Sequence, residues 1–135
     1  MADIIYNSCR QRMLAGTIDW VNDNIKAVLV SAAYTVDLAH SFYSDLTGIV
    51  SGPIAVGSNV TRLITSDGAA SAPNITFTAV SGNTIIALVI FSDTGTPSTS
   101  PLWVYLDSAN GLPFSPIGED IPVRWSTGVN KIFRP

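Results

Sequence analysis

Residues 6–20, YNSCRQRMLAGTIDW, run almost directly into residues 23–35, DNIKAVLVSAAYT, and these two pieces decide how the chain begins to fold. Apolar residues recur in the first piece at helical spacing, which predicts an amphipathic helix over about residues 3–15. Its apolar face would carry Ile5, Tyr6, Cys9, Met13 and Leu14. Asp3 is expected to cap the start of this helix, and Gly16 is expected to end it.

The second piece and the rest of the chain consist of short β-prone runs separated by clusters of Gly, Pro, Asn and Ser. This pattern is typical of an antiparallel β-sandwich or a barrel-like fold. Eight strands are expected, near residues 25–31, 48–51, 59–65, 74–80, 84–92, 101–107, 120–126 and 129–133. The whole chain, residues 1–135, is therefore expected to be one mainly β domain with a single N-terminal helix.

Three details of the strand pattern make sharper predictions. Residues 85–91 are continuously apolar, which predicts a central strand buried on both faces. In residues 75–79 apolar and polar residues alternate, so Ile75, Phe77 and Ala79 are expected to share a buried face. Residues 81–83, Ser-Gly-Asn, predict a tight hairpin between the strands on either side.

Charged side chains are scarce in this sequence. Only 13% of the residues are Asp, Glu, Lys or Arg, against roughly 25% in typical soluble domains. Such a surface suits a protein whose faces are covered by neighbours in an assembly. The net charge is −3 and the seven basic residues are scattered, which argues against nucleic-acid binding, because phosphate contacts need clustered Lys and Arg. No run approaches the roughly 18 apolar residues that would span a bilayer, so no membrane partner is expected.

No group of residues has the pattern of a catalytic or metal site, so we expect a protein that is not an enzyme and needs no cofactor or metal. His40 has Asp37, Ser41 and Asp45 nearby, but the sequence lacks a G-x-S-x-G elbow and a second histidine. A structural or solvated histidine is therefore favoured over a hydrolytic triad. The one cysteine, Cys9, lies on the apolar face of the predicted helix and is expected to be a small buried hydrophobe.

Short pieces spread over most of the chain, together with His40 and Phe42, carry a resemblance to a known family. In chain order they are YNS (6–8), MLAG (13–16), IDW (18–20), DNIKAVLV (23–30), AAYT (32–35), SDL (44–46), TIIALVIFSDTG (84–95) and SPLWVYLD (100–107). Taken together they resemble a family of small structural proteins of tailed bacteriophages. The resemblance implies a component of the virion, assembled in the cytoplasm of the bacterial host, with no enzymatic activity.

The resemblance and the composition together lead to the hypothesis of a capsid decoration or cement protein. It would bind the major capsid protein of the same phage and stabilise the head lattice by protein–protein contacts. A tail protein or head–tail adaptor, bound to other tail proteins, accounts for the same composition and stays open. A carbohydrate-binding module is a third interpretation, because Trp103, Tyr105 and Trp125 could form a platform for sugars; core packing is the commoner role of large aromatics in a small β-sandwich.

Contacts with partners, and self-association as a trimer or dimer, are expected to come from loops and from the end of the chain. The candidate contact residues are Phe42 in the irregular segment 34–47, Pro113 and Phe114 in the expected loop 108–118, and Ile132, Phe133, Arg134 and Pro135. Ile132 and Phe133 are large apolar residues flanked by the cations Lys131 and Arg134, a combination that suits an interface. Equally, Phe133 would complete the last strand of the fold, since a docked strand is a usual way to hold a terminus.

Overall fold

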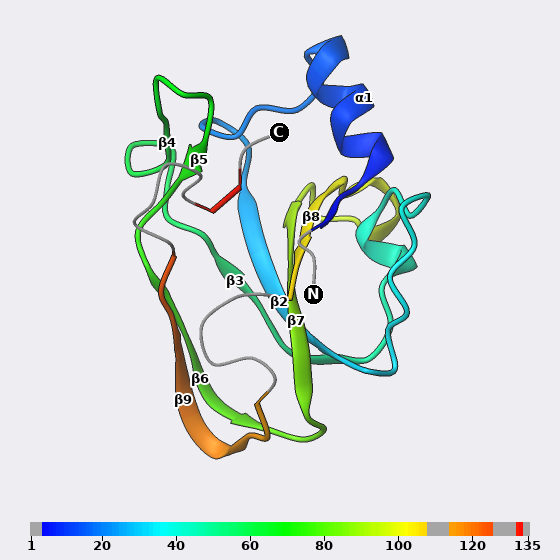
Figure 1. Cartoon of the computed structure of the whole chain (residues 1–135), viewed down its shortest axis with the longest axis vertical. Helices are drawn as coiled ribbons and strands as arrows, with labels where there is room; N and C mark the ends of the chain where they lie inside the picture. The colour runs from blue at the N-terminus through cyan, green and yellow to red at the C-terminus, as the bar shows by residue number, and fades with distance from the viewer. Residues whose placement is uncertain (1–3, 108–113, 126–131, 134–135) are drawn as a thin grey trace.

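A computed structural model describes residues 4–107, 114–125 and 132–133 of the chain (Figure 1). A five-stranded antiparallel sheet, with strand order β1-β8-β7-β2-β3, forms the centre of the molecule. Its strands are β1 (Ile4–Ile5), β2 (Ile25–Ser31), β3 (Ile49–Ala55), β7 (Ile85–Ser92) and β8 (Leu102–Leu106). The other elements are the pair β4 (Leu63–Ile64) and β5 (Ala70–Ser71), the pair β6 (Ile75–Ser81) and β9 (Ile117–Val123), the helix α1 (Asn7–Ala15), and the 3-10 turns η1 (Tyr43–Asp45) and η2 (Pro97–Thr99). The predicted mainly β, antiparallel fold with one N-terminal helix is confirmed.

Strand β7 lies inside the large sheet, as its continuous apolar run predicts. It pairs with β2 on one side, where Leu88 faces Leu29, and with β8 on the other side, where Leu88 faces Leu106. Every residue of β7 except Ile86 is buried. Because both faces of this strand are covered, it can be apolar throughout instead of alternating.

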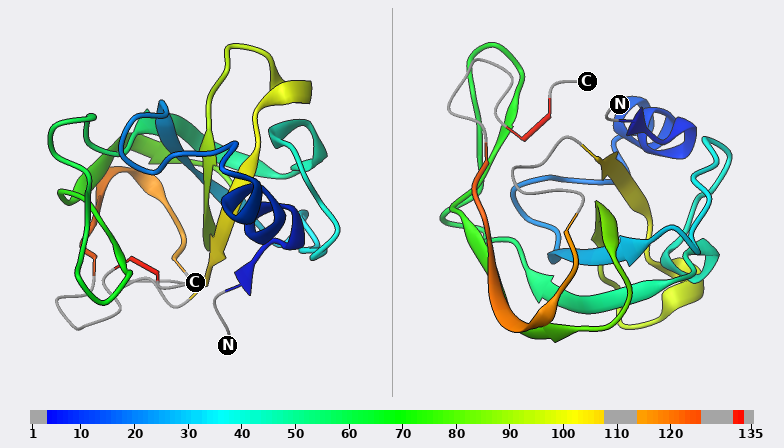
Figure 2. Two further views of the ribbon diagram at one scale, coloured as in Figure 1. Left: turned by 90° about the horizontal axis from the view of Figure 1, so that it is seen from above. Right: turned by 60° about the horizontal axis from the view of Figure 1, so that its bottom comes forward.

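The two-stranded pair β6–β9 lies beside β3 and curls around one side of the molecule (Figure 2). Ile75 and Phe77 of β6 are buried, as predicted, but Ala79 is exposed and Val80 is buried in its place. Ala79 has a positive φ of 49°, and its N–H donates a hydrogen bond of 2.9 Å to Asp120 Oδ1. A β-bulge at this point shifts the alternation by one residue, so the predicted shared face was wrong at its last member.

The segment around Gly82 does not form the predicted hairpin. β6 pairs with β9, whereas β7 pairs with β2 and β8, so the strands on either side of this turn belong to different sheets. Gly82 has a φ of 123°, a conformation that favours glycine. The turn residues therefore redirect the chain from one sheet to the other, and the hairpin prediction was wrong because it assumed that neighbours in sequence pair with each other.

Helix α1 begins at Asn7 instead of near residue 3. Ile4 and Ile5 form the edge strand β1, which pairs with β8. Two β-branched residues suit a strand better than a helix start, and the sheet edge supplies their backbone hydrogen bonds. Tyr6 takes the N-cap position, and Asp3, the predicted cap, lies outside the described residues.

The apolar face of α1 is narrower than predicted. Cys9 is fully buried and Met13, one turn later, is partly buried, but Leu14 is 92% exposed. Successive residues of a helix differ by about 100° in direction, so Leu14 cannot share the face of the other two. Gly16 ends the helix as predicted, in the left-handed conformation with a φ of 70°.

Alkylation of Cys9 is expected to be at least about 100-fold slower in the folded protein than in urea. Burial raises the pKa of the Cys9 thiol to about 12, so the reactive thiolate is scarce near neutral pH. The measurement is the rate of iodoacetamide labelling at pH 8, followed by mass spectrometry, with the urea-unfolded protein as the control. Equal rates in the two states would show that α1 does not stay docked over this thiol.

Residues 58–62 form a turn, so the strand predicted over 59–65 was wrong in its first half. Ser58 N–H donates to Thr61 Oγ1 at 2.7 Å, and Thr61 N–H donates to Ser58 O at 3.0 Å. Val60 is 79% exposed. Hydroxyl side chains that bond to nearby backbone stabilise turns, and here this effect overrides the β-propensity of the neighbouring residues.

Arg62, at the end of this turn, holds two loops together. Its side chain is buried, and its guanidinium donates hydrogen bonds to the carbonyl oxygens of Trp20, Val21, Asp23 and Val56. The Nε–Trp20 O distance is 2.7 Å and the Nη1–Val56 O distance is 2.9 Å. Burial lowers the pKa of Arg62, but an arginine in a protein keeps its charge, so these hydrogen bonds are charge-assisted. They fix the segment before β2 onto the turn after β3.

The remaining differences concern the bounds of strands. β3 extends to Ala55, beyond the strand predicted near 48–51, and β9 begins at Ile117, before the strand predicted near 120–126. The predicted loop 108–118 therefore ends earlier than expected, and its residues 108–113 lie outside the described part of the chain. Of the strand predicted near 129–133, only residues 132–133 are described.

Candidate functional site

An apolar groove lies between the end of α1 and the β4–β5 hairpin. Its volume is about 470 Å³. Met13, Gly16 and Ile18 form the wall on the side of the helix, and Ile64 and Ala70 form the wall on the side of the hairpin. The groove therefore lies between elements that are far apart in sequence.

Three aromatic rings form the floor of the groove. The ring centroids of Trp20 and Trp103 are 5.5 Å apart, and those of Trp20 and Phe133 are also 5.5 Å apart, both in edge-to-face geometry. Trp103 and Phe133 are 6.0 Å apart. Edge-to-face pairs at this distance stabilise an aromatic cluster beyond the area that they bury. The floor is therefore rigid and apolar.

Hydrogen bonds behind the floor hold both indole rings. Trp20 Nε1–H donates to Ser71 O at 3.1 Å, and Trp103 Nε1–H donates to Ser92 Oγ at 2.6 Å. Ser92 Oγ in turn donates to Asp23 Oδ2 at 3.2 Å. Because both indole N–H groups are satisfied inside the domain, the rings offer only carbon atoms to whatever enters the groove.

Asp19 builds the turn that carries Trp20 and also lies at the rim of the groove. Its Oδ1 accepts hydrogen bonds from the N–H groups of Val21 and Asn22, and its Oδ2 accepts one of 2.7 Å from the Asn22 side chain. These bonds, the Asn22 side chain first, lower the pKa of Asp19. The exposed carboxylate therefore places a negative charge beside the aromatic floor at neutral pH.

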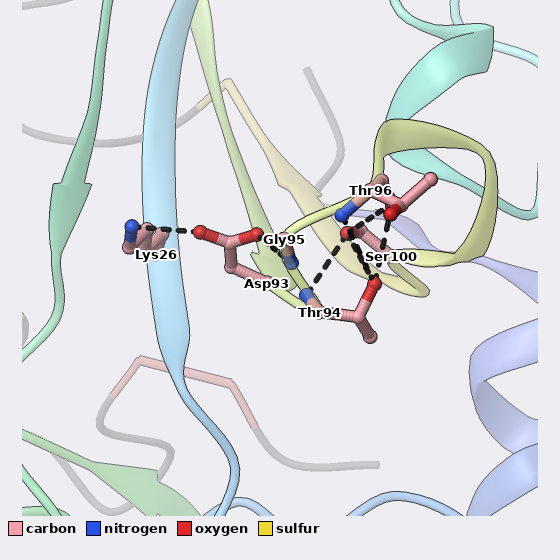
Figure 3. Close-up of polar contacts among 6 residues, drawn as sticks. All are labelled: Lys26, Asp93, Thr94, Gly95, Thr96 and Ser100. Atoms are coloured by element: carbon pink, nitrogen blue, oxygen red, sulfur yellow. Dashed lines mark hydrogen bonds and ion pairs between the residues drawn. The ribbon is translucent and has the colours of Figure 1, made fainter.

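A second hollow, of about 290 Å³, lies next to the loop that follows β7. Figure 3 shows the polar contacts of this loop. Lys26 Nζ and Asp93 Oδ2 form an ion pair of 2.7 Å at its edge. Ser100 Oγ accepts a hydrogen bond from Thr94 N–H at 3.1 Å and donates one to Thr96 O at 2.8 Å. These polar groups satisfy one another, so the network stabilises the loop and leaves the first groove as the better candidate for binding.

The one histidine is part of a chain of hydroxyl groups. Tyr34 Oη lies 2.8 Å from His40 Nδ1 and 2.7 Å from Tyr6 Oη, and both tyrosines are buried. Burial raises the pKa of Tyr6 and of Tyr34 above the usual value for tyrosine. Asp45 accepts hydrogen bonds from two backbone N–H groups of its own turn. His40 thus forms its side-chain hydrogen bond with Tyr34, and this contact is in keeping with a structural role for His40.

The aromatic residues considered for a sugar platform do not lie on a common exposed surface. Trp103 and Tyr105 are only 3% and 6% exposed. Trp125 is partly buried, and its Nε1–H donates to Pro73 O at 2.8 Å. Core packing is therefore the role of Trp103 and Tyr105, although the rim of the Trp103 ring reaches the groove.

The residues predicted as contacts are spread over the molecule. Phe42 is partly buried beneath a guanidinium group, and Phe114 forms an isolated bridge with β7. Ile132 and Phe133 are buried, and Phe133 bridges to β5, as a docked last strand predicts. Of these four, only Phe133 lines the groove. Pro113, Arg134 and Pro135 lie outside the described residues.

One aliphatic side chain of the groove wall is exposed. Ile64 of β4 lines the groove and is 60% exposed, whereas Leu63 beside it and Leu14 of α1 are exposed outside the lining. Sequence reasoning missed this site, because no residue of β4 and β5 was assigned to a surface. A tryptophan in a polar turn, Trp20, was the signal that could have indicated it. Exposed apolar surface of this kind marks interaction sites.

Comparison with known protein families finds none that matches this chain, and comparison with curated proteins finds no match either. In the described part of the chain, no three His, Cys, Asp or Glu side chains come close enough together to hold a metal ion. No helix among the described residues has both the length and the apolar character needed to cross a membrane.

Proposed function

We propose that this protein is a structural component of a tailed-phage virion, and that it acts as a capsid decoration protein. It would bind the major capsid protein by protein–protein contacts and stabilise the head lattice. A subunit that bridges neighbouring capsid proteins adds buried area across the seams that internal DNA pressure pulls apart. Self-association as a trimer or dimer is part of this proposal.

The observation that carries this proposal is the apolar groove on a surface that is poor in charge. A charged fraction of 13% suits a surface that other proteins cover. The groove offers carbon atoms from Trp20, Trp103 and Phe133, and the exposed Ile64 extends this apolar surface outward. Depletion of charge and enrichment of aromatic groups are features of the centres of protein–protein interfaces. The sequence resemblance to small phage structural proteins is the reason why we propose the virion as the place where this binding occurs.

The test is a reconstruction of the particle of the phage that encodes this chain, with mass spectrometry to count its copies. We expect density for this β fold on the outer surface of the head, repeated at each lattice position. Density confined to the tail would favour the tail or adaptor alternative over decoration. Absence of the protein from purified particles would overturn the proposal altogether.

A further inference from the structure

We infer that the groove between α1 and the β4–β5 hairpin binds an extended segment of a partner protein in which an apolar anchor residue is flanked by Lys or Arg. This inference rests on the proposed function, and it names the chemistry of the partner's contact. Three features of the groove support it: the apolar floor, the charge at the rim and the segment that already docks beside it.

The floor of the groove selects an apolar anchor. The Nε1–H groups of Trp20 and Trp103 are both bonded within the domain, so a polar group entering the groove would lose its water without gaining a partner there. An aliphatic or aromatic side chain pays no such cost. The volume of about 470 Å³ lies within the range that holds a small molecule or a few side chains.

The rim of the groove selects a positive charge. Asp19 is the one charged residue among the described residues that line the groove. Gly16, at the C-terminal end of α1, also lines it, and a helix C-terminus carries partial negative charge on its last carbonyl groups. The nearest basic side chain on that end of the helix, Arg12, is directed elsewhere, since its guanidinium lies over the Phe42 ring and bonds Ser41 O.

The chain's own residues 132–133 already dock beside the groove in an extended form. Ile132 N–H donates to Ala70 O at 3.0 Å, and Ala70 N–H donates to Phe133 O at 2.8 Å. The Phe133 ring enters the aromatic cluster, and in the sequence this apolar pair is flanked by Lys131 and Arg134. A partner segment with the same pattern, placed in the space that remains, would extend the aromatic cluster by one side chain.

The experiment follows the methyl group of Met13, which lines the groove, by NMR of protein labelled with ¹³C-methyl methionine. The chain has two methionines, so Met1 provides an internal reference. The probes are two peptides, acetyl-Lys-Leu-Phe-Arg-amide and acetyl-Glu-Leu-Phe-Glu-amide. We expect a saturable shift of Met13 with the basic peptide and about 5-fold or more weaker binding of the acidic peptide.

Matched variants separate the apolar and charged parts of the groove. Ile64→Ser is expected to weaken binding of the basic peptide by about 5- to 10-fold. Leu63 is on the same strand and equally exposed but lies outside the groove. Leu63→Ser should therefore leave the affinity for the basic peptide within about 2-fold of its original value. Asp19→Asn, which keeps an acceptor for the turn, is expected to weaken it by about 2- to 5-fold. Asp67→Asn removes the same charge outside the groove and is the control.

Three results would overturn the inference: no saturable shift of Met13 with the basic peptide, equal affinity for the two peptides, or equal effects of the Ile64 and Leu63 variants. A Met13 shift that grows with protein concentration in the absence of peptide would also overturn it, since it would assign the groove to a second copy of the chain. The peptide result is independent of the virion, so failure of the groove inference and failure of the proposed function can be told apart.

Discussion

Replacement of Arg62 by methionine is expected to lower the free energy of unfolding by about 3 to 5 kcal/mol. The guanidinium donates to four backbone carbonyls, and methionine fills a similar space but donates no hydrogen bond. Buried carbonyls would then lose charge-assisted partners while staying shielded from water. Urea unfolding followed by tryptophan fluorescence measures the change.

Arg124→Met is the matched control for this prediction, because Arg124 is exposed and its loss should change stability by less than about 0.5 kcal/mol. Arg62→Lys tests the geometry. A lysine keeps the charge but lacks the planar guanidinium that donates to several carbonyls at once. It should therefore recover only part of the lost free energy of unfolding. If Arg62→Met and Arg124→Met lost equal stability, the idea that Arg62 joins the two loops would be wrong.

Replacement of Gly52 by alanine is expected to cost about 3 kcal/mol or more of stability. A Cβ atom at this position would lie 2.8 Å from Ala27 O and 3.2 Å from Val28 Cα, which are backbone atoms of the neighbouring strand, and 3.1 Å from the Phe77 ring. The φ of 97° at Gly52 is also unfavourable for any residue with a Cβ. β3 would have to move away from β2, which would loosen this edge of the sheet.

Gly95→Ala separates these two causes. Gly95 has a similar φ of 89°, but a Cβ there would meet nothing within 4 Å. It should therefore cost only the backbone strain, about 1 to 2 kcal/mol. Chemical denaturation of both variants under the same conditions gives the comparison. Equal losses would mean that β3 moves freely and that its close approach to β2 does not constrain the sheet.

The sequence predicted the strands whose residues carry a strong local pattern. The apolar run of β7 and the β-branched run of β2 can be satisfied only in the centre of a sheet, and both strands lie there. Where the pattern was weak, tertiary contacts decided. In the sequence, Ile4 and Ile5 continue the apolar pattern of the helix. In the structure, they form hydrogen bonds with the edge of β8 instead. The bulge at Ala79 depends on a carboxylate 41 residues away, which no local pattern contains.

The groove could not be predicted from the sequence for a similar reason. Its floor joins Trp20, Trp103 and Phe133, which become neighbours only after the strand order is set. Trp103 taken singly has the pattern of an ordinary core residue, and neither Trp20 in its polar turn nor Phe133 between two cations indicates that the three rings meet. The chemistry of single residues was easier to infer: Cys9 is a buried thiol and His40 takes part in local hydrogen bonds, as their surroundings in the sequence indicated.

The pairing of Ile4 with Tyr105 bears on the order in which this protein can fold. A ribosome releases a chain from its N-terminus, so β1 must wait until β8 has been synthesised before its backbone hydrogen bonds can form. The first turn of α1 is tied to the same event, since Tyr6 N–H bonds Trp103 O. Contacts between residues so distant in sequence require the closure of a long loop, which slows folding. The central sheet is thus completed only after β8 has been synthesised, and until then β1 has no β8 edge to pair with.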